Sequence, residues 1–254
     1  MKIAVCAGEK SGDALGYDLL LDLKKNNDSI HFIGVGGSLM ESAGLKSFFP
    51  INEISYMGLI DPLINLRKIL KIRKEFIEFL KVEKPDIFIG IDSPSFNSAI
   101  CKTLRKTTNI KTIQYVCPKF WAWRYGRVYE FNDIYDKVFS IFPFESKLLE
   151  KHKVNFSYVG HPLANKLPTK INDNELKKEL KISQNKKIIA ILPGSRKSEI
   201  KHHEKPLIDF IKRYKLEDPN LEIILALNKE SDLSEGFKKN EKNLKIIFNK
   251  TQKV

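Results

Sequence analysis

A short apolar run that leads into an Asp-Ser-Pro sequence constrains the fold of this chain more than any other feature. Residues 87–91 (IFIGI) show no alternation of polar and apolar side chains, which is typical of a strand buried on both faces of a parallel sheet. Asp92, Ser93 and Pro94 end the strand, because proline lacks an N–H donor and restricts the residue before it. In open α/β sheets, ligands bind outside the carboxyl ends of the strands. Asp92 is therefore predicted to lie at a ligand-binding edge, although an Asp that only caps the following helix would give the same sequence.

Short apolar segments alternate with helical segments along the whole chain, and this order predicts an α/β fold built on parallel sheets. We expect strands at residues 2–7, 30–35, 87–91, 110–116, 137–142, 156–159, 187–192, 221–227 and 244–248. Helices are expected at residues 14–25, 38–43, 63–77, 97–105, 145–151, 175–180 and 200–215. A polar stretch at about residues 167–173 predicts a domain boundary. We therefore expect a Rossmann-like N-terminal domain at 1–166, a linker region at 167–186 and a second Rossmann-like domain at 187–254. Three strands are few for such a domain, so the second one is expected to be incomplete.

The net charge of +13 comes mainly from lysine, because only seven of the 44 cationic residues are arginine. Proteins that read nucleic acid rely on arginine forks and aromatic platforms, and no such cluster is visible, so nucleic acid is not an expected partner. Anionic small substrates or an anionic membrane surface suit the charge better. The three cysteines and five histidines show no metal-ligand spacing, so no metal site is predicted and buried, reduced thiols are expected. We see neither a signal peptide nor a membrane span, which favours a cytoplasmic protein.

The segment after the first strand contains several candidate site residues, Gly8, Glu9, Ser11, Gly12 and Asp13. The spacing of Gly8 and Gly12 matches neither a dinucleotide fingerprint nor a Walker loop. Ser11 and Asp13 would also be explained as helix caps. Glu9 is the stronger candidate, because a carboxylate in a tight loop at the carboxyl edge of a sheet has little structural reason to be there.

Apolar and basic residues recur with helical spacing from residue 63 to 77 and predict a basic amphipathic helix. Such a helix either covers the sheet, as crossover helices do, or lies on a membrane surface. We favour the first for most of its length. The residues expected to meet a membrane or acyl chains are Met57, Leu59, Ile60, Arg67, Lys68 and Lys71.

The loop expected after the strand at 110–116 is rich in aromatic residues, with Phe120, Trp121 and Trp123 ahead of Arg124. Large aromatic side chains are usually part of the core. Their crowding in a proline-containing loop at the ligand-binding edge also suits the wall of a substrate site. Both interpretations stay open on the sequence.

Five motifs occur in a fixed order: AGEKSGD at 7–13, GIDSPSFN at 90–97, YVCPKFWAWR at 115–124, GHPLAN at 160–165 and LPGSR at 192–196. Together they closely resemble the lipid-A-disaccharide synthase family of bacterial glycosyltransferases. The resemblance extends to about Leu227. It implies the GT-B fold, with two Rossmann-like domains, of which the second is expected to be truncated in this chain.

The resemblance implies an inverting transfer of diacylated glucosamine from UDP-2,3-diacylglucosamine to the 6-hydroxyl of 2,3-diacylglucosamine 1-phosphate. It implies no metal or cofactor, a peripheral location on the anionic inner membrane, and a homodimer in the full-length form. Asp92 would then be the catalytic base, with Glu9 assisting it. Substrate-binding residues would be Gly8, Ser11, Gly12, Asp13, Asn97, Trp121 and Arg124, and the donor diphosphate would meet Gly194, Ser195 and Arg196.

The chain departs from the family pattern at two points that affect the interpretation. Relatives often carry a second acid where this chain has Ser95, so no carboxylate pair is invoked. Most uridine contacts of the family come from a region beyond residue 254, so we expect the chain alone to have little or no transferase activity. Two alternatives share the architecture or the charge: a UDP-sugar epimerase, and a non-catalytic domain that binds anionic lipid.

Overall fold

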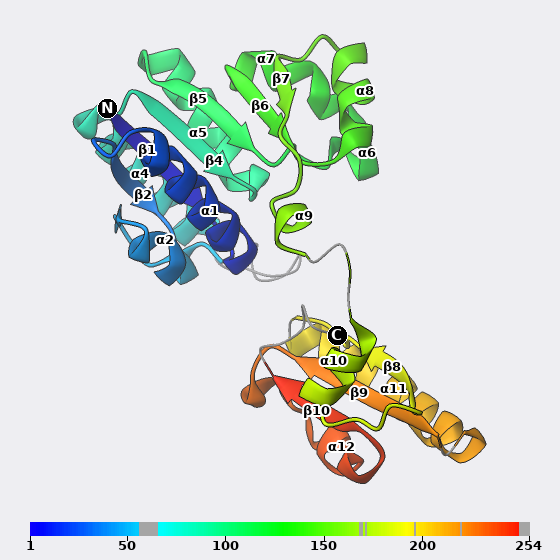
Figure 1. The fold of residues 1–254 in the computed structure, drawn as a ribbon. Helices are drawn as coiled ribbons and strands as arrows, with labels where there is room; N and C mark the ends of the chain where they lie inside the picture. The colour runs from blue at the N-terminus through cyan, green and yellow to red at the C-terminus, as the bar shows by residue number, and fades with distance from the viewer. Residues whose placement is uncertain (56–65, 168–169, 171, 196, 219, 249–254) are drawn as a thin grey trace. The chain divides into compact units, whose positions relative to one another are not determined.

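The computed structural model describes residues 1–55, 66–167, 170, 172–195, 197–218 and 220–248. The chain divides into two compact units, Met1–Lys166 and Leu167–Val254, each with its own parallel sheet (Figure 1). The predicted α/β class is confirmed. Among the described residues, no helix is both long enough and apolar enough to cross a bilayer.

The first unit is built on seven parallel strands in the order β3-β2-β1-β4-β5-β6-β7. This is the Rossmann order, extended by one strand. The strands are β1 (Lys2–Ala7), β2 (His31–Val35), β3 (Leu45–Ser47), β4 (Ile87–Ile91), β5 (Lys111–Tyr115), β6 (Lys137–Ser140) and β7 (Phe156–Tyr158). Because β1 pairs with both β2 and β4, the strand order reverses between β1 and β4.

Both faces of the sheet are buried at its centre, which explains why β1 and β4 read as nearly unbroken apolar runs. On one face Ala4, Cys6 and Phe88 belong to a large core cluster. On the other face the alternate residues Ile3 and Val5 belong to a second cluster. The three cysteines are buried and free, as predicted, and burial raises the pKa of their thiols.

The helices of the first unit are α1 (Lys10–Asn26), α2 (Ser38–Ser42), α4 (Leu66–Glu83), α5 (Pro94–Thr107), α6 (Phe120–Trp123), α7 (Phe131–Ile134), α8 (Pro143–Lys151) and α9 (Leu163–Lys166), with 3-10 turns η1 (Ile51–Glu53) and η2 (Tyr125–Glu130). Three of these helices, α1, α5 and α8, start two to four residues earlier than the sequence predicts, and α2 starts where it was predicted. Pro94 and Pro143 stand at the first position of α5 and α8, where the fixed φ of proline suits a helix and its missing N–H costs nothing. The sequence analysis did not predict α6, η2 and α7.

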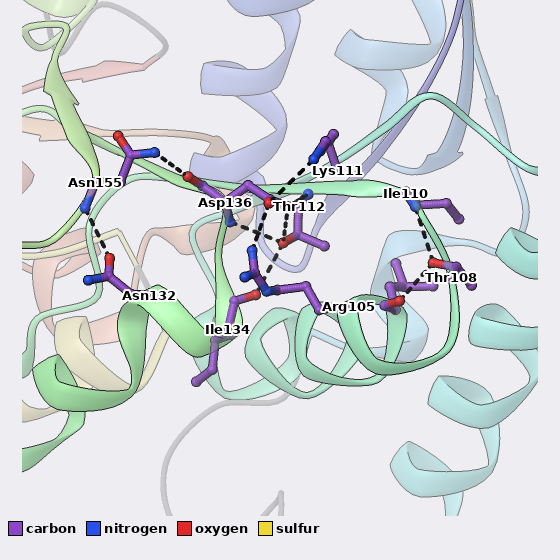
Figure 2. A network of polar contacts seen from close by, with 10 residues as sticks. Arg105, Thr108, Ile110, Lys111, Thr112, Asn132, Ile134, Asp136 and Asn155 are labelled. Atoms are coloured by element: carbon purple, nitrogen blue, oxygen red, sulfur yellow. Dashed lines mark hydrogen bonds and ion pairs between the residues drawn. The ribbon is translucent and has the colours of Figure 1, made fainter.

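A polar network closes the amino ends of β5 and β6 (Figure 2). The Asp136 carboxylate accepts hydrogen bonds from the Thr112 N–H at 2.8 Å and its hydroxyl at 3.2 Å, and pairs with Arg105 at 2.7 Å. Burial acts to raise the pKa of Asp136, but the Thr112 bonds and the Arg105 guanidinium outweigh it and lower the pKa below its usual value. This network stabilises the edge of the sheet opposite to the one where ligands are expected.

The second unit has three parallel strands in the order β10-β9-β8. Its elements are α10 (Asp173–Glu179), β8 (Lys187–Ile191), α11 (Lys197–Glu217), β9 (Leu221–Leu227), η3 (Glu230–Asp232), α12 (Glu235–Lys238), η4 (Glu241–Asn243) and β10 (Lys245–Phe248). Residues Leu180 and Ile182 lie in the segment expected to be a linker, and both are buried against Ile224 of β9. The segment therefore packs on the sheet of this unit.

Candidate active site

The candidate site lies where the strand order of the first sheet reverses. Cys6 pairs with Gly90 and Ala7 with Ile91, so the loops that leave β1 and β4 begin side by side. A side chain added at Gly8 would collide with the side chain of Ser93, which shows how closely these loops approach. Ligands of doubly wound folds bind at this kind of switch point. The structure thus brings Glu9 and Asp92, predicted from separate motifs, to adjacent loops of one edge.

The backbone at this edge is strained. Asp92 and Ser93 have φ values of 50° and 42°, and Val116, which directly follows β5, has a φ of 74°. Left-handed conformations cost about 1–2 kcal/mol per non-glycine residue, and for a β-branched residue such as Val116 they are true outliers. Strain of this kind persists only where the surroundings enforce it, and it is concentrated at functional sites.

Two buried amides hold the strained turn, and we call Asn97 and Gln114 the amide clamp. Both side chains are fully buried. Asn97 Nδ2 and Gln114 Nε2 each donate to the Asp92 carbonyl oxygen at 3.0 Å. Gln114 Nε2 also lies 3.3 Å from the carbonyl oxygen of Val116. The clamp therefore joins the ends of β4 and β5.

The amide clamp destabilises the core relative to apolar side chains of the same size. Asn97 Oδ1 and Gln114 Oε1 are buried with no hydrogen-bond partner in the part of the chain that the structure describes. A buried acceptor without a partner costs about 1–3 kcal/mol. Gly90 lies beneath both amides, and a Cβ there would come within 2.7 Å of Asn97 Cβ. Two costly amides and a glycine are thus used to fix one turn, the turn that carries Asp92.

The side chain of Asp92 does not act as the helix cap that the sequence left open. Ser93 is the N-cap residue of α5, and no side chain caps that helix. The half-buried Asp92 carboxylate makes no hydrogen bond or ion pair with the described residues. It is therefore available to a ligand. Glu9 is also half-buried and is the N-cap residue of α1, again without a side-chain cap bond.

Asp13 has a structural role that the sequence does not reveal. It is buried within the first turn of α1, and its carboxylate accepts hydrogen bonds from the backbone N–H groups of Gly37, Leu39 and Met40. These donors begin α2, so Asp13 satisfies the amino end of a neighbouring helix. Asp13 therefore serves the amino end of α2 and does not cap its own helix.

Of the other residues predicted for the site in the β1 and β4 loops, two have structural roles and one is exposed. Gly12 is buried against Ala7 and the Ile91 carbonyl, where its lack of a side chain permits close packing. Ser11 is exposed. Asn97 belongs to the amide clamp, so it acts on Asp92 and has no surface open to a substrate.

The aromatic loop after β5 is anchored by a buried acid. Trp121 Nε1 donates to Glu145 Oε1 at 3.3 Å, and the Trp121 ring packs edge-on against Phe144. Burial raises the pKa of Glu145, and the indole N–H opposes this rise. The indole of Trp123 is largely exposed, with the Arg124 guanidinium 4.4 Å above its ring. Phe120 belongs to the core, so both interpretations of the aromatics are partly correct.

In the second unit, Gly194 and Ser195 form the loop between β8 and α11. Gly194 has a φ of 135°, which favours glycine. The Ser195 N–H donates to the Glu199 carboxylate at 2.9 Å, so this loop already holds an anionic group of the chain itself. Arg196 lies outside the described residues.

The predicted membrane residues fall partly outside the described chain, since Met57, Leu59 and Ile60 are not covered. In α4, Phe76, Ile77 and Leu80 are buried and cover the sheet. The amino half of the same helix exposes Leu66 and Leu70 beside basic residues, with Arg67, Lys68 and Lys71 all exposed. Lys68 pairs with Glu53 at 2.6 Å.

Sequence reasoning missed Gln114, Gly90 and Glu145. A signal existed for Gln114, because it is an uncharged polar residue near the end of an apolar strand. Nothing in the sequence links it to Asp92, which lies 22 positions away. Among the described residues no group of three or more acidic, histidine or cysteine side chains is placed to hold a metal ion.

Solved structures with a similar fold place the chain in a class. A UDP-GlcNAc 2-epimerase from Neisseria meningitidis matches 98% of this chain and 72% of its own, with a TM-score of 0.64 and 13% identity. A glycosyltransferase from Rickettsia africae matches 99% of this chain and 68% of its own, with a TM-score of 0.53 and 15% identity. At such identities only the fold is shown. The protein is an α/β protein of the GT-B-like class, as predicted.

Closer relatives define the family within that class. Residues 3–253 match the family model of lipid-A-disaccharide synthetase, and the chain belongs to this family. Lipid-A-disaccharide synthases from Pseudomonas syringae pv. tomato and Colwellia psychrerythraea are 40% and 35% identical over 89% and 99% of this chain. One from Idiomarina loihiensis is 43% identical over 78% of it. The chain spans 52% to 65% of the length of these relatives.

Proposed function

We propose that the chain provides the acceptor-side active site of a lipid-A-type glycosyltransferase. The substrates would be UDP-2,3-diacylglucosamine and 2,3-diacylglucosamine 1-phosphate, and the products lipid A disaccharide 1-phosphate and UDP. The observation that carries this proposal is the Asp92 carboxylate, which has no partner among the described residues and stands on a strained and clamped turn at the sheet's switch point. Family membership supplies the substrate class.

In this proposal Asp92 acts as the general base. Its carboxylate accepts the proton of the acceptor 6-hydroxyl as the hydroxyl oxygen attacks the anomeric carbon of the donor. The bond from that carbon to the UDP oxygen breaks on the opposite side, which gives inversion. Glu9, on the adjacent loop, would orient a sugar hydroxyl or support the base.

The loop at Gly194 and Ser195 is proposed to receive the departing diphosphate. Backbone N–H groups that lead into a helix are natural anion donors, and α11 starts at Lys197. The Ser195 N–H already donates a hydrogen bond to the Glu199 carboxylate, and the diphosphate would replace that carboxylate as the acceptor. Arg196 would add a guanidinium to the same charge.

Membrane contact is proposed for the amino half of α4 and the segment before it. Exposed Leu66 and Leu70 stand among cations in a chain of net charge +13, which suits an anionic lipid surface. Such contact would bring the site to acyl-chain substrates at the inner membrane. Pairing into a homodimer is proposed only for a full-length form.

A chimera tests the proposal, because the chain spans only part of its relatives' length. Residues 1–166 of this chain would precede the remaining part of the Pseudomonas syringae relative, and the 254-residue chain would be assayed beside it. We expect the chimera to form disaccharide only when both glycolipids are present, and the chain alone to form little. Epimerised or free sugar without acceptor would indicate the epimerase alternative. Lipid binding without any product from the chimera would indicate a non-catalytic domain, and robust turnover by the chain alone would contradict the expected low activity.

A further inference from the structure

A groove beside the clamped turn takes no part in the proposed proton transfer. It has a volume of about 310 Å³ and lies between one face of α5 and the segment formed by η2 and α7. The face of α5 consists of Ser95, Ser98, Ala99 and Lys102, which helical spacing places in one row. Because Pro94 and Ser95 line its beginning, the groove starts two residues beyond Asp92.

The groove has an apolar floor and one cation, Arg127, that pairs with no carboxylate of the described residues. Phe131 and Ile134 supply apolar surface. Arg127 of η2 lines the groove and is half-buried, and no carboxylate of the described residues pairs with it. The nearby acid Glu130 is paired with Lys102 at 3.2 Å. The net charge of these three side chains is therefore positive, and the unpaired charge belongs to Arg127.

Two hydroxyl groups lie close together in the same groove. The Tyr135 hydroxyl lies 2.5 Å from Ser98 Oγ, which in turn donates to the Pro94 carbonyl. Burial raises the pKa of Tyr135, and the hydrogen bond with Ser98 and the charge of Arg127 oppose that rise. A half-buried arginine that pairs with no described carboxylate suits a phosphate, because the planar guanidinium donates two parallel hydrogen bonds to it.

We propose that this groove is the binding site for the anomeric phosphate of the acceptor, with Arg127 as its main contact. The inference rests on the proposed function, since it places the acceptor's second functional end next to the base that serves its 6-hydroxyl. The volume is at the low end for small-molecule sites, so the groove takes a sugar phosphate and leaves acyl chains outside.

The test uses glucosamine 1-phosphate and glucosamine as soluble probes, titrated into the 254-residue chain by calorimetry and by NMR. We expect the phosphorylated probe to bind about 10- to 100-fold more tightly, as a hydrogen bond to a charged group implies. Arg127→Gln should remove this preference and leave the affinity for glucosamine unchanged. Arg213→Gln removes the same charge from an exposed site on α11, paired with Glu217, and should keep the preference.

A second variant checks the groove itself. Ala99→Phe fills it without changing charge, and should weaken the binding of both probes. The inference is overturned if Arg127→Gln keeps the phosphate preference, if Ala99→Phe binds both probes like the unchanged chain, or if neither probe binds. An active chimera whose phosphate preference ignores Arg127 would remove this inference alone. Arg127-dependent phosphate binding with no disaccharide formation would instead remove the proposed function.

Discussion

Replacing Gln114 by Met tests whether the amide clamp exists for chemistry or for stability. Methionine keeps the length of the side chain and removes both its polar atoms. The lost donor makes one well-formed bond to Asp92 O at 3.0 Å and longer ones to the carbonyl oxygens of Tyr115 and Val116, at 3.4 and 3.3 Å. Their loss costs about 1 kcal/mol net, whereas removal of the unpartnered Oε1 returns about 1–3 kcal/mol. We therefore expect the free energy of unfolding to stay within about 2 kcal/mol of the unchanged protein.

The rate of transfer should respond differently from stability. The left-handed conformations of Asp92 and Ser93 store about 2–4 kcal/mol together, and half of the clamp that holds them is gone. As the turn relaxes, the position of the carboxylate is lost, and we expect the single-turnover rate of the chimera to fall about 10- to 100-fold, or about 1.4–2.8 kcal/mol.

The matched control for Gln114→Met is Thr112→Val, a change of a buried polar residue at the opposite end of the same strand. It removes hydroxyl contacts of the Asp136 network and should lower stability with little change in rate. Denaturant unfolding and rapid-quench kinetics give the two quantities. The reasoning is refuted if Gln114→Met leaves the rate within twofold, or if it costs more than about 3 kcal/mol of stability and so acts as ordinary scaffold.

Three further predictions concern stability and membrane contact. Gly90→Ala should destabilise the chain by about 1–3 kcal/mol in denaturant unfolding, because its Cβ collides with both amides, and an unchanged midpoint would show that the core yields there. Asp136→Asn should cost about 1.5–3 kcal/mol at pH 7. Since the folded pKa of Asp136 is lowered, its stabilisation is present above the unfolded value of 3.8 and is lost as the pH falls through the folded pKa, so the difference between the two proteins should shrink in acid. A constant difference down to pH 2 would contradict that assignment. Leu70→Glu should weaken binding to anionic vesicles about 5- to 10-fold, since partial burial of a leucine is worth about 1 kcal/mol. Equal flotation of both proteins would remove α4 from the membrane contact.

The central strands β1 and β4 were predictable because each is an almost unbroken apolar run that is buried on both faces. The carboxyl-edge position of Asp92 followed from the proline that ends its strand, and the five motifs indicated the family. These are local signals, carried by residues adjacent in sequence. The start of α1 at Lys10 was missed because its local signal is absent. The N-cap residue Glu9 makes no side-chain cap bond, so no capping pattern marks the start of the helix in the sequence.

The features that define the site were not predictable because they join distant residues. Asp13 looked like a cap for its own helix, but it serves donors more than 20 positions away. The contact of Gln114 with Asp92 requires the pairing of β4 with β5, and the position of Arg127 requires η2, which no periodic pattern marks. Left-handed φ at Asp92, Ser93 and Val116 leaves no trace in composition. Tertiary structure determined what each of these residues does.

The most direct test of the account is the single-turnover rate of the chimera after Asp92→Asn. The substitution keeps the shape of the side chain and removes its ability to accept the proton. Loss of a general base predicts a fall of about 100- to 10,000-fold, with acceptor binding unchanged. The control is Asp86→Asn, just before the amino end of β4, where the carboxylate accepts the Lys2 N–H at 2.8 Å and the rate should stay near that of the unchanged chimera. If Asp92→Asn transfers sugar within tenfold of the unchanged chimera, Asp92 is not the base and the central claim is wrong.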